Sequence, residues 1–103
     1  MKYIEVITTF ETNDDAEKMA NQILGAKIGA CCSIQEIKSI YNWKEKIESG
    51  TEFQLTIKTK ETLYSELEAL ILKNHPYETP QIVALPILMG SKDYLSWMDK
   101  ETK

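Results

Sequence analysis

The stretch EFQLTIKT, residues 52–59, alternates strictly between polar and apolar side chains. Phe53, Leu55 and Ile57 occupy every second position, and charged or polar residues lie between them. Successive side chains of a strand point to opposite faces of its sheet. The pattern therefore predicts a strand with one face in the core and the other near solvent, as in an antiparallel hairpin.

The first arm of that hairpin is expected over residues 30–43, which have strand character. Ile34 and Ile37 are out of phase with a strict alternation, and this offset predicts a β-bulge near Gln35. Residues 44–50 are charged and turn-like, so we expect them to connect the two arms.

Residues 3–10 are rich in β-branched and aromatic side chains and are predicted to form the first strand. A threonine and an acid three residues later, Thr12 and Asp15, are typical of a helix start. Apolar residues then recur at helical spacing, and Gly29 is a plausible stop. A second helix is predicted from about Thr62 to His75, because Pro76 cannot continue it.

Residues 82–88 are predicted to form a last strand, in which Pro86 indicates an edge or a strand end. A short helix follows Gly90. The order βαββαβ plus a final helix predicts an α+β, ferredoxin-like sandwich, with two helices on one face of a four-stranded sheet. Residues 1–103 are expected to form a single domain.

The composition excludes several functional classes. The net charge is −4 and the 12 basic residues, all lysines, are dispersed along the chain, so no nucleic-acid footprint is expected. No apolar run approaches the ~20 residues of a membrane span. Cys31 and Cys32 are sequence neighbours and do not indicate a secreted disulfide framework, so a cytoplasmic location is expected.

Several short motifs resemble one known family. They are SIYNW (residues 39–43) followed by KIE (46–48), HPYETP (75–80), LPI (85–87) and YLSW (94–97). In this order, over nearly the whole chain, they resemble the CutA divalent-cation tolerance family.

The resemblance implies a ferredoxin-like subunit in a tight homotrimer, architecturally similar to PII proteins. It also implies an association with copper or other divalent cations, none of which is required for folding, and it implies no reaction. The chain departs from the family pattern at Cys32 and Ser33 and at Glu45, where glycine is common. Cysteine and histidine, which some relatives use, are replaced by Thr8 and Asn74.

His75 and Glu78 are the candidate metal ligands, because imidazole and carboxylate groups bind copper and zinc. Two other interpretations of His75 stay open: a local contact at the end of the second helix, and contact with a small molecule. For Cys31 and Cys32, core packing is favoured over soft-metal binding, since neighbours on a strand point to opposite faces.

A polar and aromatic pocket is the second candidate site. Its expected residues are Tyr41, Trp43, Lys46, Glu48, Lys58 and Tyr77. Rigid aromatic walls with a few charges suit a ligand, but tyrosine and tryptophan are also enriched at subunit interfaces.

Three functions follow from these interpretations. The first is a homotrimeric divalent-cation tolerance protein that binds copper or another metal and takes part in the response to metal ions. The second is a PII-like module that senses a small molecule between subunits. The third is an enzyme with a shared site, for which we find no catalytic motif.

Overall fold

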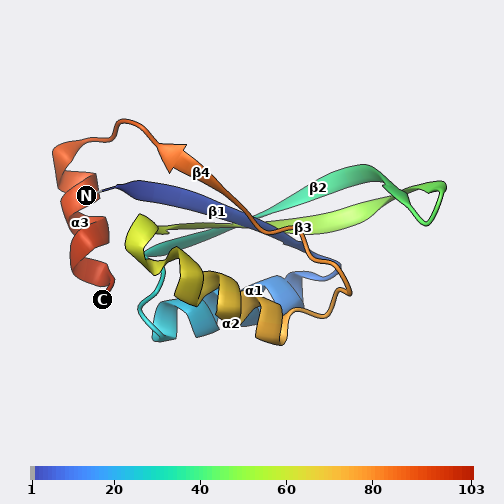
Figure 1. The fold of residues 1–103 in the computed structure, drawn as a ribbon, viewed down its shortest axis with the longest axis horizontal. Helices are drawn as coiled ribbons and strands as arrows, with labels where there is room; N and C mark the ends of the chain where they lie inside the picture. The colour runs from blue at the N-terminus through green and yellow to red at the C-terminus, as the bar shows by residue number, and fades with distance from the viewer. Residues whose placement is uncertain (1) are drawn as a thin grey trace.

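The computed structural model describes residues 2–103. Its elements are β1 (Tyr3–Phe10), α1 (Asn13–Gly25), β2 (Cys31–Trp43), β3 (Lys46–Lys60), a 3-10 turn (Glu61–Leu63), α2 (Tyr64–Asn74), β4 (Val83–Ile87) and α3 (Lys92–Glu101). The strands form one antiparallel sheet in the order β2-β3-β1-β4. In Figure 1, α1 and α2 lie side by side along the sheet, and α3 stands at one end of it. The α+β, ferredoxin-like arrangement is confirmed.

The core lies between the sheet and α1 and α2. Leu55 and Ile57 of β3 are fully buried, as predicted from the alternation of residues 52–59. From the helices they meet Ile23, Leu67 and Ile71, which are also fully buried in the same cluster. Burying each such side chain contributes about 1.5–3 kcal/mol.

Helix α1 begins where the sequence predicts. The Oγ1 atom of Thr12 accepts a hydrogen bond of 3.1 Å from the backbone N–H of Asp15. This bond satisfies one of the N–H groups that the first turn of a helix leaves free.

The predicted end of α1 at Gly29 is wrong, because the helix ends at Gly25. Lys27 turns the chain with a φ of 58°, and the N–H of Ile28 donates to the carbonyl of Ile23 at 3.3 Å. These are features of a Schellman motif, here with a lysine in the place that glycine usually takes. Gly29 is required by packing instead, since a Cβ there would lie 2.6 Å from Ile23 Cγ2.

The bulge predicted near Gln35 is also wrong. Partners run without a break from Cys31 opposite Lys58 to Trp43 opposite Lys46. Ile34 packs against the core, so by alternation Ile37 lies on the other face of the sheet, where it is half-buried. The two isoleucines are out of phase because both faces carry apolar residues.

The hairpin turn is shorter than predicted. Residues 46–50 belong to β3, and the turn is limited to Lys44 and Glu45, with φ values of 49° and 66°. Two successive residues with positive φ are typical of a type I′ turn, whose twist matches that of the flanking strands.

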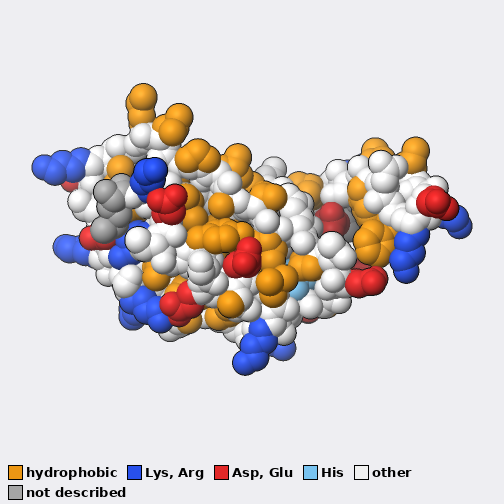
Figure 2. Space-filling model, in the orientation of Figure 1, with side chains coloured by type: hydrophobic (Ala, Val, Ile, Leu, Met, Phe, Trp, Pro, Cys, Tyr) orange, Lys and Arg blue, Asp and Glu red, His pale blue; other side chains and the backbone are white. Residues whose placement is uncertain are grey.

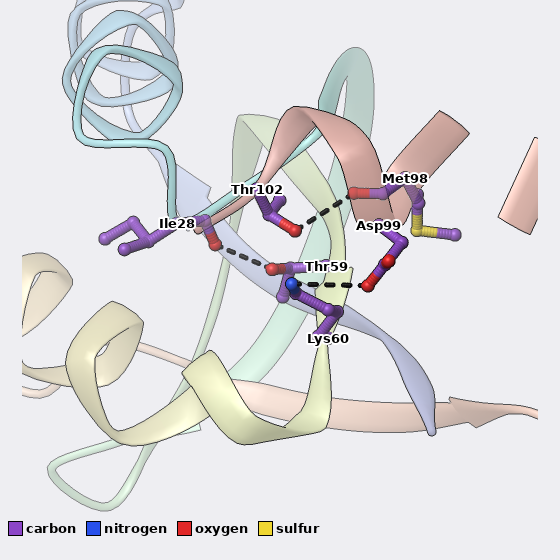
Figure 3. A network of polar contacts seen from close by, with 6 residues as sticks. All are labelled: Ile28, Thr59, Lys60, Met98, Asp99 and Thr102. Carbon is purple, nitrogen blue, oxygen red and sulfur yellow. Dashed lines mark hydrogen bonds and ion pairs between the residues drawn. The ribbon is translucent and has the colours of Figure 1, made fainter. Parts of the chain in front are cut away.

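Helix α3 is fixed to the sheet by polar and apolar contacts, of which Figure 3 shows the polar ones. Met98 is fully buried, and Lys60 Nζ lies 3.4 Å from Asp99 Oδ1. On the neighbouring residue of β3, Thr59 Oγ1 donates to the carbonyl of Ile28 at 2.7 Å. These contacts connect the end of β3 both to α3 and to the segment after α1.

Strands β2 and β4 are the two edges of the sheet. Pro86 lies on β4, so its predicted place on an edge strand is confirmed. β4 is one residue shorter at each end than the predicted strand. Within residues 2–103, no helix is long and apolar enough to cross a membrane.

Candidate functional site

The candidate site is a cleft at the base of the long hairpin. β1 ends at Phe10, opposite Phe53, so residues 46–52 of β3 pair with β2 alone and project beyond the sheet body. The projecting arm is visible in Figures 1 and 2. Residues 76–81, which join α2 to β4, meet the arm and enclose a cleft of about 820 Å³.

The lining combines aromatic and charged side chains. Its members are Thr9, Lys38, Ser39, Ile40, Tyr41, Asn42, Trp43, Glu52, Pro76, Tyr77, Glu78, Thr79 and Gln81. Several rigid aromatic rings beside a few placed polar groups are typical of a ligand site.

His75 fixes the start of the 76–81 segment. Its Nδ1 accepts a hydrogen bond of 3.1 Å from the backbone N–H of Tyr77, and its Nε2 lies 2.8 Å from the carbonyl oxygen of Thr9. A carbonyl can only accept, so Nε2 carries the proton and the ring is neutral. The ring also stacks on Phe10, with centroids 4.3 Å apart. These contacts join the end of α2 to the end of β1.

The surroundings of His75 favour this neutral form. Burial lowers its pKa, because a charged imidazolium loses hydration there. The Thr9 carbonyl and the carboxylates of Asp15 and Glu52 act in the opposite direction on the pKa, but burial prevails.

Tyr77 connects the segment to the hairpin. Its hydroxyl donates to Glu52 Oε2 at 2.8 Å. Burial raises the pKa of Tyr77, and the hydrogen bond to Glu52 raises it further. The phenol therefore stays protonated and holds the Glu52 carboxylate at the edge of the cleft.

The structure brings together some of the residues predicted for the sites. Tyr41, Trp43, Tyr77 and Glu78 all line the cleft, and His75 lies directly before Pro76 in its wall.

The other three residues of the predicted pocket lie elsewhere in this chain. Lys46 and Glu48 are exposed on the projecting arm, opposite Trp43 and Tyr41, and do not line the cleft. Lys58 is at the far end of β3, where its Nζ lies 3.7 Å from Glu5 Oε1. The register of β3 separates Lys58 from the cleft.

Glu52 and Lys38 also line the cleft, although neither was predicted as a site residue. Glu52 appeared only as one of the polar residues that alternate along β3. The feature that marks Glu52 is its position one residue before Phe53, which is the first residue of β3, in chain order, that pairs with β1. That feature becomes readable only with the strand register.

The two cysteines are free and lie on opposite faces of β2, as predicted. Cys32 packs against the core, and burial raises its pKa to about 12. The core-packing interpretation is confirmed for Cys32, whereas Cys31 is on the face without α1 and α2.

The donors for a metal ion are sparse within one subunit. Among residues 2–103, no group of three or more His, Cys, Asp or Glu side chains is placed to hold an ion. Both ring nitrogens of His75 already have protein partners. Glu78 is exposed and can supply oxygen ligands. The donor set fits a weak site or one completed by another subunit, and does not fit a closed structural centre.

Together, the fold and the site define a class: a small ferredoxin-like domain with two open sheet edges and a cleft suited to binding. The family model described as CutA1 divalent ion tolerance protein matches residues 4–101. The chain belongs to this CutA1 family.

Relatives of known family are similar in sequence to this chain over nearly its whole length. A divalent-cation tolerance protein CutA of Pyrococcus horikoshii is 37% identical over 100 residues, covering 97% of this chain and 98% of the relative. A probable divalent-cation tolerance protein cutA homolog of Encephalitozoon cuniculi is 37% identical over 94 residues, covering 91% of this chain and 82% of the relative.

Solved structures agree with the fold. The crystal structure of CutA1 from Pyrococcus horikoshii gives a TM-score of 0.94 at 37% identity, covering 97% of this chain and 98% of that one. The structure of the periplasmic divalent cation tolerance protein CutA from Archaeoglobus fulgidus gives a TM-score of 0.96 at 35% identity. The match covers 98% of this chain and 99% of that one.

Proposed function

We propose that the protein acts in divalent-cation tolerance as a homotrimer that binds copper or another divalent cation weakly. Membership of the CutA1 family carries the first part of this proposal. The names of the relatives refer to tolerance of divalent cations and to no reaction, so the proposed role is binding and not catalysis.

The trimer is supported by the surfaces that one chain leaves open. β2 and β4 present unpaired backbone groups along both edges of the sheet, which favours pairing with another chain. Six large apolar side chains near these edges and on α3 are between 38% and 48% exposed. They are Tyr41, Trp43, Val83, Leu85, Tyr94 and Trp97. Such residues are enriched in subunit interfaces.

The proposed metal ligands are His75 and Glu78. His75 would first have to exchange one hydrogen-bond partner, and its 3.1 Å bond from the Tyr77 N–H is the longer of the two. Nδ1 is therefore the atom that a metal would reach more readily. The loss of that bond on binding is consistent with weak affinity.

Calorimetric titration with copper and zinc tests the metal proposal. Glu78→Gln should weaken binding, because it removes the charge while keeping an amide oxygen. Glu101→Gln, which removes an exposed carboxylate on α3, is the matched control and should bind as the wild type does. Equal affinities for all three proteins would remove Glu78 from the site.

His75→Ala should also reduce metal affinity, provided that sedimentation shows an unchanged assembly. Titrations of the wild type and His75→Ala that superimpose from acid to neutral pH would remove His75 as a ligand.

A second candidate function is a small-molecule-binding module of the PII-like kind. The cleft of about 820 Å³, with its aromatic walls, favours it. Glu78 belongs to both proposed sites, since it lines the cleft and is also a proposed metal ligand.

We also propose a cytoplasmic location, on the sequence features given above. One relative is called chloroplastic and one solved relative is called periplasmic, so the compartment varies within the family. Fractionation of cells that produce the full natural chain would test this location.

A further inference from the structure

The aromatic residues of the cleft are its first distinctive feature. Tyr41 and Trp43 come from β2, and Tyr77 comes from the segment after α2. In one chain Tyr41 is 48% exposed and Trp43 is 38% exposed, which leaves ring surface that a ligand or a neighbouring subunit can contact. Aromatic ring faces carry partial negative charge and attract cations.

The charges of the lining are its second feature. Glu52 and Glu78 provide two carboxylates, whereas Lys38 is the one basic residue in the lining. The chain as a whole has a net charge of −4 and contains no arginine. It therefore lacks the planar fork that usually grips carboxylate or phosphate ligands. The cleft is better suited to a positive ligand than to an anion.

Glu52 is held in position for such a ligand. Tyr77 uses one oxygen of its carboxylate, at 2.8 Å. A carboxylate has about four acceptor positions, so the group keeps capacity for a ligand N–H or for the charge of an ammonium ion. Because Glu52 is half-buried, its charge is less screened by water than that of a surface carboxylate.

Trp43 already attracts a cation from its own chain. Lys44 Nζ lies 5.6 Å from the centroid of the Trp43 ring, within the range of a cation–π interaction. Lys44 does not belong to the lining of the cleft, so it does not fill the site. The contact indicates that the indole is placed to interact with positive charge.

We propose that the cleft binds a small organic cation, an alkylammonium or quaternary ammonium compound. The aromatic rings would contact its apolar groups and its charge, while Glu52 and Glu78 would balance the charge. The inference rests on the second candidate function, ligand binding in the cleft. Copper and zinc bind through donor atoms such as imidazole nitrogen and carboxylate oxygen and gain little from aromatic walls, so this ligand class is distinct from the metal.

Three probes of one shape test the proposal. Choline is the cation. The neutral probe is 3,3-dimethylbutan-1-ol, in which carbon replaces the quaternary nitrogen of choline. The anion is the matching carboxylate, 3,3-dimethylbutanoate. Calorimetric titration of the wild-type protein, in its native assembly and without metal, should show choline binding about tenfold tighter than the neutral isostere. The anion should bind less tightly than either.

Two variants locate the binding. Glu52→Gln keeps an acceptor for the Tyr77 hydroxyl but removes the charge, and Trp43→Leu removes the aromatic face. Each should weaken choline binding at least several-fold and reduce the preference for choline over the neutral isostere. Glu101→Gln, on α3, is the control for the loss of one carboxylate and should leave both unchanged. Sedimentation of each variant verifies that its assembly is intact.

Each contrary result has a distinct meaning. Equal binding of the cation and the neutral isostere, or preference for the anion, would overturn the ligand class while leaving the cleft as a small-molecule site. Choline binding that none of the cleft variants weakens would place the site elsewhere and overturn the proposal. Failure of all three probes at millimolar concentration would also overturn it. The metal titrations use no organic ligand and test the first function separately.

Discussion

At the scale of single residues, Thr8 is an exception because its buried side chain has a polar atom without a hydrogen-bond partner in the described part of the chain. It is fully buried on β1, and its Oγ1 has no hydrogen-bond partner within residues 2–103. A buried hydroxyl without a partner costs free energy, because it has lost its bonds to water. A hydroxyl at this position therefore opposes folding.

Thr8→Val should stabilise the protein. Valine has nearly the same shape, so the change removes the unpaired hydroxyl without opening a cavity, and we expect a gain of about 1 kcal/mol. Urea denaturation would measure it. Thr8→Ser keeps the hydroxyl and removes the methyl group, so it should lower stability. A Thr8→Val protein that unfolds at lower urea than the wild type would show that Thr8 has a partner in solution.

His75 should make stability depend on pH. Burial holds its pKa below 6.5, so the unfolded chain takes up a proton before the folded protein does. The stabilisation from the neutral ring is fully present above pH 6.5 and is lost as the pH falls through the folded pKa. Protonation of Nδ1 would also set an N–H against the N–H of Tyr77.

Denaturation curves measured from pH 8 to pH 5 test the His75 prediction. The wild type should lose stability as the pH falls. In His75→Asn, which has no titrating ring, the curve should be flatter over the same interval. If the two curves have the same slope, other groups cause the pH dependence.

At the scale of elements, the hairpin turn contains two strained residues. Lys44 and Glu45 both have positive φ, a conformation that costs residues with a Cβ about 1–2 kcal/mol. Asparagine and glycine are usual at these positions, so the local sequence disfavours the conformation of this turn. The long strands on both sides hold it.

Glu45→Gly should therefore stabilise the hairpin, by about 1 kcal/mol after allowing for the greater freedom of glycine in the unfolded chain. The thermal unfolding midpoint would measure the gain. Glu45→Ala is the control, because it removes the same charge but keeps the Cβ. An equal gain in both variants would assign the effect to charge and not to backbone conformation.

The elements that the sequence predicts best depend on local rules. The spacing of Thr12 and Asp15 marks the start of α1, and Pro76 marks the end of α2, because each acts on its own backbone. The cleft is different. Glu52 and Tyr77 are far apart in sequence and meet only because the hairpin projects past β1, which depends on the register of the whole sheet.

At the scale of the whole molecule, the two open edges of the sheet are of different kinds. β2 has 13 residues and β4 has five. Contact between the β2 edge of one chain and the β4 edge of the next is heterologous, and such contacts form a closed ring when the rotation between chains permits. Three chains are the number that the family resemblance implies.

Sedimentation should find a species of three chains, each of 11.8 kDa, at micromolar concentration. Leu85→Lys places a charge on the β4 edge, where the leucine is 44% exposed in one chain, and should shift the protein toward monomer. Leu72→Lys makes the same change on α2, at a leucine that is 55% exposed and outside both edge strands, and should leave the assembly intact. If both variants sediment as the wild type does, β4 is not at the interface. A wild-type protein that sediments as a folded monomer would overturn the trimer itself.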